Sequence, residues 1–211
     1  INYNKTLNSH MMKNDEWGAV AYLSKSKYGK DTEEVWINNS SSYITGAAGN
    51  SASATEDVGT TADYDSTQGV NASTTGTVYG VYDMSGGAWE YVAAYVDNKS
   101  SNLTKYGGSL ENGEVKTKNV YNKGSSDIQA NNYSANSEKY GDAVYETNTN
   151  CRGSTSWYSD YSNFPYTSSP SFKRGGAYDN GMSAGVFSIE GENCYSCLLY
   201  TSDAADDLIG V

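Results

Sequence analysis

Residues 75–92 (TGTVYGVYDMSGGAWEYV) constrain the fold of this chain more than any other stretch. Residues 78–82 alternate apolar and aromatic side chains around a glycine, in the manner of a short strand. Gly86 and Gly87 follow, and glycine adopts positive φ angles without steric cost. A second aromatic run resumes at residues 89–92. Taken alone, this pattern predicts a hairpin-like core element with a bulge.

The same block resembles the G-x-Y-D-M-x-G-N-x-W-E-W signature of the formylglycine-generating enzyme (sulfatase-modifying factor) superfamily, a branch of the C-type-lectin-like fold. Two more blocks occur in the family's order. Residues 11–29 are similar to its early helix, and residues 172–188 are similar to its R-G-G-S strand and following loop. Residues 98–150 match no block. The resemblance implies an α+β, C-type-lectin-like domain with a small twisted antiparallel sheet, about two helices and long irregular loops.

Two departures from the family pattern bear on function. Aerobic enzymes of the family bind copper through a Cys pair after the R-G-G block, whereas this chain has no Cys there until Cys194. Neither Asn nor Met replaces a thiolate in that chemistry. Gly87 stands where the signature has the Asn of a calcium-binding neighbourhood, and Glu90 alone does not make a calcium site. We therefore expect no catalytic residues and no cofactor, with calcium as the one candidate ion.

We expect that neither end of this chain is a native terminus. Residues 197–211 back-translate to the sequence of a common transposase-based sequencing adapter, so we interpret them as non-native. An acidic native tail is the alternative. The chain begins at Ile1, without an initiator Met. We therefore expect one domain over residues 1–196, truncated at both ends, as in a gene fragment assembled from short environmental reads.

Composition excludes several function classes. The formal net charge is −11, and −8 without the three Asp residues of the 197–211 segment. An acidic chain without Lys clusters is not expected to bind nucleic acid. No apolar run approaches the roughly 20 residues that span a bilayer. We expect an extracellular or cell-surface location, with any signal or anchor upstream of Ile1.

Few residues are available for metal or nucleophilic chemistry. His10 is the only histidine, and we interpret it as a capping or core residue near the first helix. Cys151 and Cys194 remain once the adapter-like segment is set aside, and their spacing alone does not show whether they pair. No His/Asp/Ser constellation and no distinct carboxylate pair occurs.

Tyrosine dominates the aromatic residues, with 20 Tyr against 3 Phe and 4 Trp. A buried Tyr needs a hydrogen-bond partner, so many of these rings should be partly exposed. Tyr, Ser, Gly and Asn are also enriched in antibody-type binding surfaces, although loop-rich bacterial domains share this composition. We expect a ligand surface on residues 177–195, aided by the preceding aromatic cluster. Its predicted residues are Tyr178, Asp179, Asn180, Met182, Phe187, Glu190, Glu192, Asn193, Tyr195, Trp157 and Tyr161.

Local patterns predict the remaining elements. A helix should begin at Asn14 or Asp15 and run to about Ser26, burying Trp17, Val20, Ala21 and Tyr28. Residues 38–77 should form long surface loops with one short helix. Residues 141–146 should start a helix or turn, and Arg174 should introduce the last strand pair. There is no alternating strand–helix pattern, which argues against a doubly wound sheet.

Three functions are compatible with these features. The leading one is a non-catalytic ligand-binding domain of a secreted or surface-displayed bacterial or phage protein, with a protein or glycan ligand. Such a module is sometimes diversified by retroelements after the R-G-G block. The second is an enzyme of the same superfamily with altered chemistry. The third is a purely structural module of a surface protein.

Overall fold

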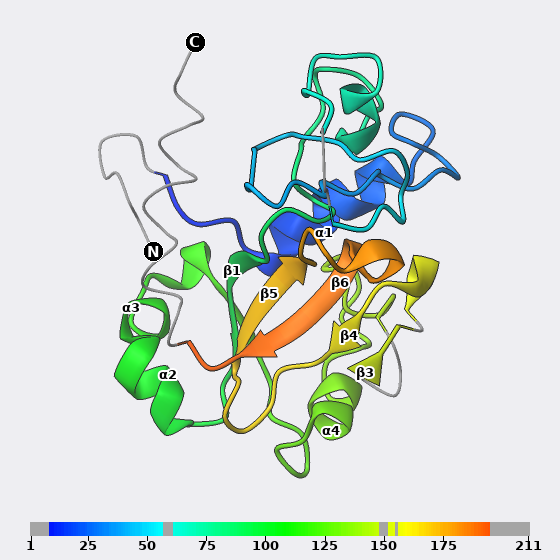
Figure 1. Ribbon diagram of the computed structural model, residues 1–211. Coiled ribbons are helices and arrows are strands. Elements are labelled where there is room, and N and C mark those ends of the chain that lie inside the picture. The colour runs from blue at the N-terminus through cyan, green and yellow to red at the C-terminus, as the bar shows by residue number, and fades with distance from the viewer. Residues whose placement is uncertain (1–8, 57–60, 148–151, 155, 195–211) are drawn as a thin grey trace.

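The computed structural model describes residues 9–56, 61–147, 152–154 and 156–194 (Figure 1). This part of the chain has a mixed α+β fold. Its α-helices are α1 (Asn14–Ser24), α2 (Ser101–Tyr106), α3 (Gly108–Glu111) and α4 (Gln129–Ser134). Its strands are β1 (Glu90–Val96), β2 (Asn119–Tyr121), β3 (Arg152–Gly153), β4 (Ser162–Asn163), β5 (Ser171–Gly175) and β6 (Gly185–Glu192). Short 3-10 turns are η1 (Gly69–Ala72), η2 (Val115–Thr117), η3 (Trp157–Ser159) and η4 (Gly181–Ser183).

The described strands form one sheet in the order β2-β1-β5-β6-β4-β3. Its centre, β1-β5-β6, is antiparallel, whereas β2 lies parallel to β1 and β4 lies parallel to β6. The expectation of an antiparallel sheet is therefore wrong for its flanks. A parallel pair requires a crossover connection, and the chain makes one through α2 and α3 between β1 and β2. These crossover helices also raise the helix content above the expected two.

Alternation along β1 divides the core between the two faces of the sheet. Val92 and Val96 join the main cluster, which α1 covers through Trp17 and Ala21. Residues of β1 that point the other way, such as Tyr95, pack against α2 and α3 in a second cluster. This period of two is the ordinary consequence of strand geometry.

The first helix matches its prediction in place and in part of its buried face. Trp17 and Ala21 are buried, and Val20 packs against the main cluster. The predicted caps are wrong, because Lys13 is the N-cap and its backbone N–H donates to the Glu16 carboxylate at 2.8 Å. Tyr28 is also wrong as a core residue. The chain turns away after Ser24, and Tyr28 is 78 % exposed.

The expected strand at residues 78–82 is absent from the described structure, which has turns there. Tyr79 is 93 % exposed. The hydroxyls of Ser73, Thr75 and Thr77 bond one another and nearby backbone N–H groups instead. Short hydroxyl side chains compete in this way with strand pairing. The second half of the block does form a strand, β1.

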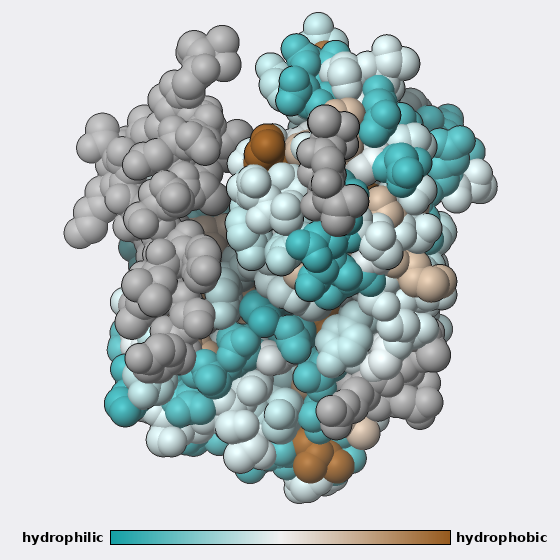
Figure 2. Space-filling view, viewed as in Figure 1, coloured by the Kyte–Doolittle hydropathy of each residue, from teal (hydrophilic) through white to brown (hydrophobic). Residues whose placement is uncertain are grey.

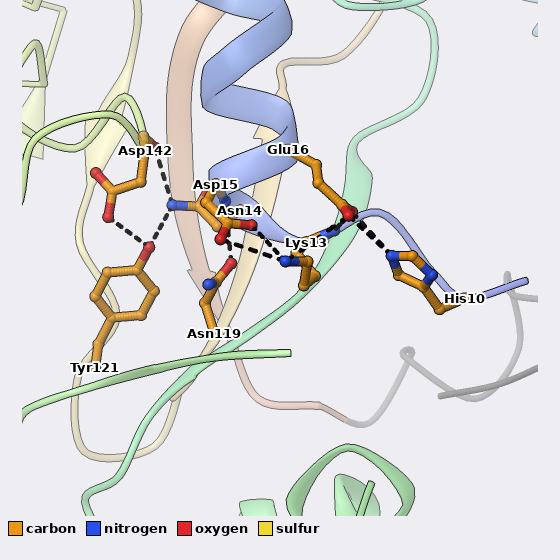
Figure 3. Close-up of polar contacts among 8 residues, drawn as sticks. All are labelled: His10, Lys13, Asn14, Asp15, Glu16, Asn119, Tyr121 and Asp142. Carbon is orange, nitrogen blue, oxygen red and sulfur yellow. Dashed lines mark hydrogen bonds and ion pairs between the residues drawn. The ribbon is translucent and has the colours of Figure 1, made fainter. Parts of the chain in front are cut away.

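A buried polar network joins α1 to the sheet. Arg174 of β5 is fully buried, and its Nε donates to Asn14 Oδ1 at 2.7 Å. Its other nitrogens donate to the backbone carbonyls of Asp142, Ala143 and Ser188. In Figure 3, Asn14 also donates to the hydroxyl of Tyr121, which donates in turn to the Asp142 carboxylate at 2.7 Å. Arg174 thus ties loop carbonyls together, and residues 141–146 form the expected turn.

The structure describes His10 and Cys194 but not Cys151. His10 lies before α1 and bonds the Glu16 carboxylate at 2.9 Å (Figure 3). Cys194 is buried in the second cluster. Cys151 lies outside the described residues, so the pairing of the two cysteines stays a prediction. Residues 197–211 also lie outside them.

Candidate functional site

Four stretches of irregular chain meet at one end of the sheet, in the upper part of Figure 1. Figure 2 shows that the surface of this upper part is mostly hydrophilic. Asn38 bridges to Gly86, and Ala48 bridges to Ala62. The backbone N–H of Tyr178 donates to the carbonyl of Gly87 at 2.8 Å. These contacts join residues 38–56, 61–66, 82–87 and 176–184 into one surface, which we call the loop face.

Asp83 anchors the loop face from beneath. Its carboxylate accepts hydrogen bonds from the Asn38 side chain at 2.7 Å and from the Gly46 backbone N–H at 3.0 and 3.1 Å. Asn38 also donates to the carbonyl of Ile44 at 2.8 Å. Burial raises the pKa of Asp83, although these donors oppose the shift. The loop at residues 43–46 is therefore held in place by a satisfied polar group.

Gly86 makes this anchoring possible. Its φ is 78°, and a Cβ at this position would collide with the side chain of Ile37 and the backbone of Asn38. Only glycine allows both the left-handed conformation and this close approach. The prediction of positive φ at the Gly86–Gly87 pair is confirmed.

Two tyrosine pairs stand on the loop face. The rings of Tyr43 and Tyr178 meet edge to face, with centroids 5.2 Å apart. Tyr64 and Tyr82 do the same at 5.9 Å, and the Tyr82 hydroxyl donates to the carbonyl of Tyr64 at 3.0 Å. Tyr43 is 58 % exposed and Tyr64 is 50 % exposed. Edge-to-face pairing fixes the rings without burying them.

Four residues of the predicted ligand surface lie on the loop face. Tyr178 belongs to the first tyrosine pair, and Asp179 is exposed beside it. Asn180 accepts a hydrogen bond from the backbone N–H of Ala177 at 2.8 Å and donates to Asp179 at 3.2 Å. Met182, on η4, is 57 % exposed. The structure thus brings together the part of the prediction nearest the R-G-G block.

Trp157 and Tyr161 lie on the adjoining segment, which includes η3. Trp157 is 50 % exposed and packs its ring against Phe187. Tyr161 meets Trp89 edge to face at 6.4 Å. The backbone N–H of Tyr161 donates to the carbonyl of Ser183, so this segment is attached to the end of η4.

Phe187 does not belong to any ligand surface. It is completely buried in the main core, where Tyr22, Trp157 and Tyr158 surround its ring. The prediction assigned it outward because alternate side chains of a strand face opposite sides. Its neighbours Val186 and Ser188 are also buried, because this strand is covered on both faces. Alternation alone therefore does not identify a solvent side here.

Glu190 and Glu192 lie on the sheet, away from the tyrosine pairs. Both pair with Lys173 of the neighbouring strand, at 2.8 and 3.1 Å. The Lys173 ammonium also lies 5.1 Å from the Trp89 ring. Asn193 follows at the end of β6, and Tyr195 lies outside the described residues.

The sequence prediction missed Tyr43, Tyr64 and Tyr82. Tyr43 and Tyr64 lie in the stretch predicted as surface loops, and Tyr82 lies in the segment predicted as a strand. The available signal was weak: Tyr43 and Tyr64 are isolated aromatic residues in mainly polar segments, and Tyr64 lies between two Asp residues. An isolated ring in a polar segment is a candidate for an exposed contact rather than for the core.

Calcium does not fit the residues beside Gly87. The side-chain nitrogen of Asn38 lies 3.4 Å from the position that a Gly87 Cβ would take, and it points its N–H at Asp83. Together with the N–H of Gly46, it presents donors where a calcium ion needs oxygen ligands. Across the described residues, no group of three or more His, Cys, Asp or Glu side chains has metal-binding geometry.

A small cleft lies between the end of α1 and the start of β6. Its lining includes Lys25, Glu34, Tyr158 and Asp160, and its volume is about 10 Å³. Burial raises the pKa of Asp160 well above its usual range, although this carboxylate accepts the backbone N–H of Phe187 at 2.8 Å. The space is that of about one water molecule, too small for a substrate.

The loop face is thus an aromatic surface whose loops are held in place by hydrogen bonds to Asp83. No family model, curated protein or solved structure matches this chain. Within the described residues, no helix has the length and apolar character needed to cross a membrane.

Proposed function

We propose that this chain is a non-catalytic ligand-binding domain with a C-type-lectin-like fold, in which the loop face contacts a protein or glycan. One observation carries the proposal: long loops are tied to a polar anchor and present two pre-oriented tyrosine pairs, each with one exposed and one half-buried ring. Rigid aromatic side chains provide contact area at a low entropic cost. Binding residues are also disproportionately found on loops held by a rigid scaffold.

The packing of the three family-like blocks supports the proposed fold. The indole of Trp17, from the first block, donates to the carbonyl of Val186 in the third at 2.8 Å. The backbone N–H of Gly86, from the second block, donates to the carbonyl of Gly175 at 3.0 Å. The blocks that resemble the family therefore contact one another, although they are far apart in sequence.

A secreted or surface-displayed bacterial or phage protein is the setting in which we place this domain. If the segment after Arg174 is diversified, its buried positions should not tolerate substitution. Tyr178, Asp179 and Met182 reach solvent, whereas Phe187 and Ile189 are completely buried. Variation should therefore concentrate at the exposed positions of the loop face.

The enzyme alternative makes a distinct prediction. There is no Cys between Arg174 and Asn193, where the family's copper-binding pair would lie. We expect no conversion of a Cys-containing sulfatase peptide to formylglycine, with or without copper. Mass spectrometry of the peptide after incubation is the measurement. Copper-dependent formation of the aldehyde would establish an enzyme and contradict the proposal.

The binding function is tested by removing one tyrosine pair. The Tyr43→Ser/Tyr178→Ser variant should weaken binding by about 2 kcal/mol, the scale of aromatic hot spots. The melting temperature should change little, since both rings are on the surface. The measurement is biolayer interferometry against immobilised bacterial polysaccharides and purified bacterial surface proteins.

A matched control is available on the same chain. Tyr140 and Tyr145 form another exposed pair, with centroids 5.4 Å apart, in the turn after α4 and outside the loop face. The Tyr140→Ser/Tyr145→Ser variant should bind as the wild-type protein does. Equal losses in both variants, or unchanged affinity in the Tyr43/Tyr178 variant, would contradict a ligand site on the loop face.

A further inference from the structure

The loop face combines exposed aromatic rings with charge of one sign. There is no Lys or Arg between Asp31 and Asn98, and none follows Arg174. These two stretches supply all of the loop face. Its exposed charges are therefore all negative, and they are Glu56, Asp63, Asp65 and Asp179.

We propose that the loop face binds a polypeptide segment carrying Lys or Arg side chains. This inference rests on the proposed function and specifies the chemistry of its ligand. A surface with negative charge alone attracts cationic partners and disfavours anionic ones. A polyanionic glycan would meet this surface with like charge.

Lys30, which lies beside Gly76, does not neutralise the loop face. Lys30 is only 8 % exposed, and its ammonium lies 3.3 Å from the side-chain oxygen of Asn71 and 3.4 Å from Glu33. Near the tyrosine pair, Tyr43 and then Glu56 raise the pKa of the Tyr178 hydroxyl, as expected in a negative field. The negative potential of this surface is thus available to a partner.

Among the described residues, no cation lies over the rings of the loop face. Elsewhere in the chain, Lys ammonium groups lie over aromatic rings, as with Lys25 over Tyr158 at 3.6 Å and Lys173 over Trp89 at 5.1 Å. No such contact in the described structure involves the loop-face tyrosines, which are Tyr43, Tyr64, Tyr82 and Tyr178. A cation over an aromatic ring is a favourable contact, and guanidinium groups favour it most. A cation at this surface can therefore contact an aromatic ring and a carboxylate at the same time.

The test uses three fluorescein-labelled peptides of equal length, about twelve residues, built from Lys-Gly, Ser-Gly or Glu-Gly repeats. We expect the full chain to bind the Lys-Gly peptide and neither of the others, by fluorescence anisotropy at low ionic strength. Binding should weaken as NaCl is raised, because exposed charges are screened. The Tyr43→Ser/Tyr178→Ser variant should weaken it about tenfold, from the loss of two exposed cation–ring contacts.

Matched variants separate this site from general attraction to an acidic protein. Asp179→Asn on the loop face should weaken binding about threefold. Glu138→Gln, which removes one exposed charge after α4, should have no effect, and neither should Tyr140→Ser/Tyr145→Ser. Equal losses for the loop-face and control variants would overturn the proposal, as would absence of Lys-Gly binding.

The outcomes also distinguish this inference from the function on which it rests. Suppose that the tyrosine variant no longer binds a polysaccharide or surface protein, that the Asp179→Asn variant binds it normally, and that salt does not change this binding. This result would overturn the cationic ligand and retain the loop-face site. If the tyrosine variant keeps every interaction of the wild-type protein, both proposals fail.

Discussion

Replacing Arg174 with Met should destabilise this protein by about 3–5 kcal/mol, the usual cost of breaking a buried charged network from one side. The guanidinium is fully buried and satisfies the side chain of Asn14 together with the carbonyls of Asp142, Ala143 and Ser188. Met removes all of these donors and leaves buried oxygens without them. The melting temperature should fall by on the order of 10 °C.

Lys123→Met is the matched control for Arg174→Met, because it removes a positive charge at an exposed position. It should change the free energy of unfolding by less than about 0.5 kcal/mol. Thermal and urea unfolding measure both variants. If Arg174→Met unfolds at the same temperature as the control, the network does not hold α1 to the sheet.

Glu90→Gln should remove a pH-dependent loss of stability. Burial, and then the charge of Asp83, raises the pKa of Glu90 from 4.5 to about 7. Between these values the folded state holds a proton that the unfolded state has lost, so stability falls as pH rises. Below pH 4.5 both states are protonated and the loss vanishes; above about 7 it is complete. A shift of this size corresponds to roughly 3–4 kcal/mol.

The measurement is urea unfolding of wild type and Glu90→Gln at pH 4.5 and pH 8. The variant should be more stable than wild type at pH 8, and the two should be similar at pH 4.5. The pKa of Asp83 is raised as well, so some pH dependence should remain in the variant. Exposed Glu138→Gln should follow the wild-type profile at both values. Identical profiles for all three proteins would mean that Glu90 titrates normally.

Local signals in the sequence predicted the elements that depend on nearby residues. The spacing of Trp17 and Ala21 identified α1 and its buried face, because helical periodicity is fixed by the backbone. The R-G-G block identified the strand pair that begins with β5, although it did not indicate that Arg174 is fully buried. The glycine pair at residues 86–87 identified its own positive φ angles.

Long-range contacts could not be predicted in this way. Nothing in the residues of β2 or β4 specifies a parallel neighbour, because that depends on where the connecting chain returns. The anchor at Asp83 likewise depends on Asn38 and Gly46, which are 45 and 37 residues away. The tyrosine pairs depend on the loop positions that this anchor fixes. The sequence therefore indicated only those loop-face residues that follow Arg174.

The central sheet pairs strands that are far apart in the sequence. This separation determines when the loop face can form during synthesis. Arg174 bonds Asn14 across 160 residues, and β1 pairs with β5 only after the intervening elements have been made. Chains dominated by such distant contacts fold slowly, since loop closure precedes the gain from packing. During synthesis, the Tyr43 loop therefore waits for Tyr178 to leave the ribosome. A chain that ends before Tyr178 therefore lacks the Tyr43–Tyr178 pair of the loop face.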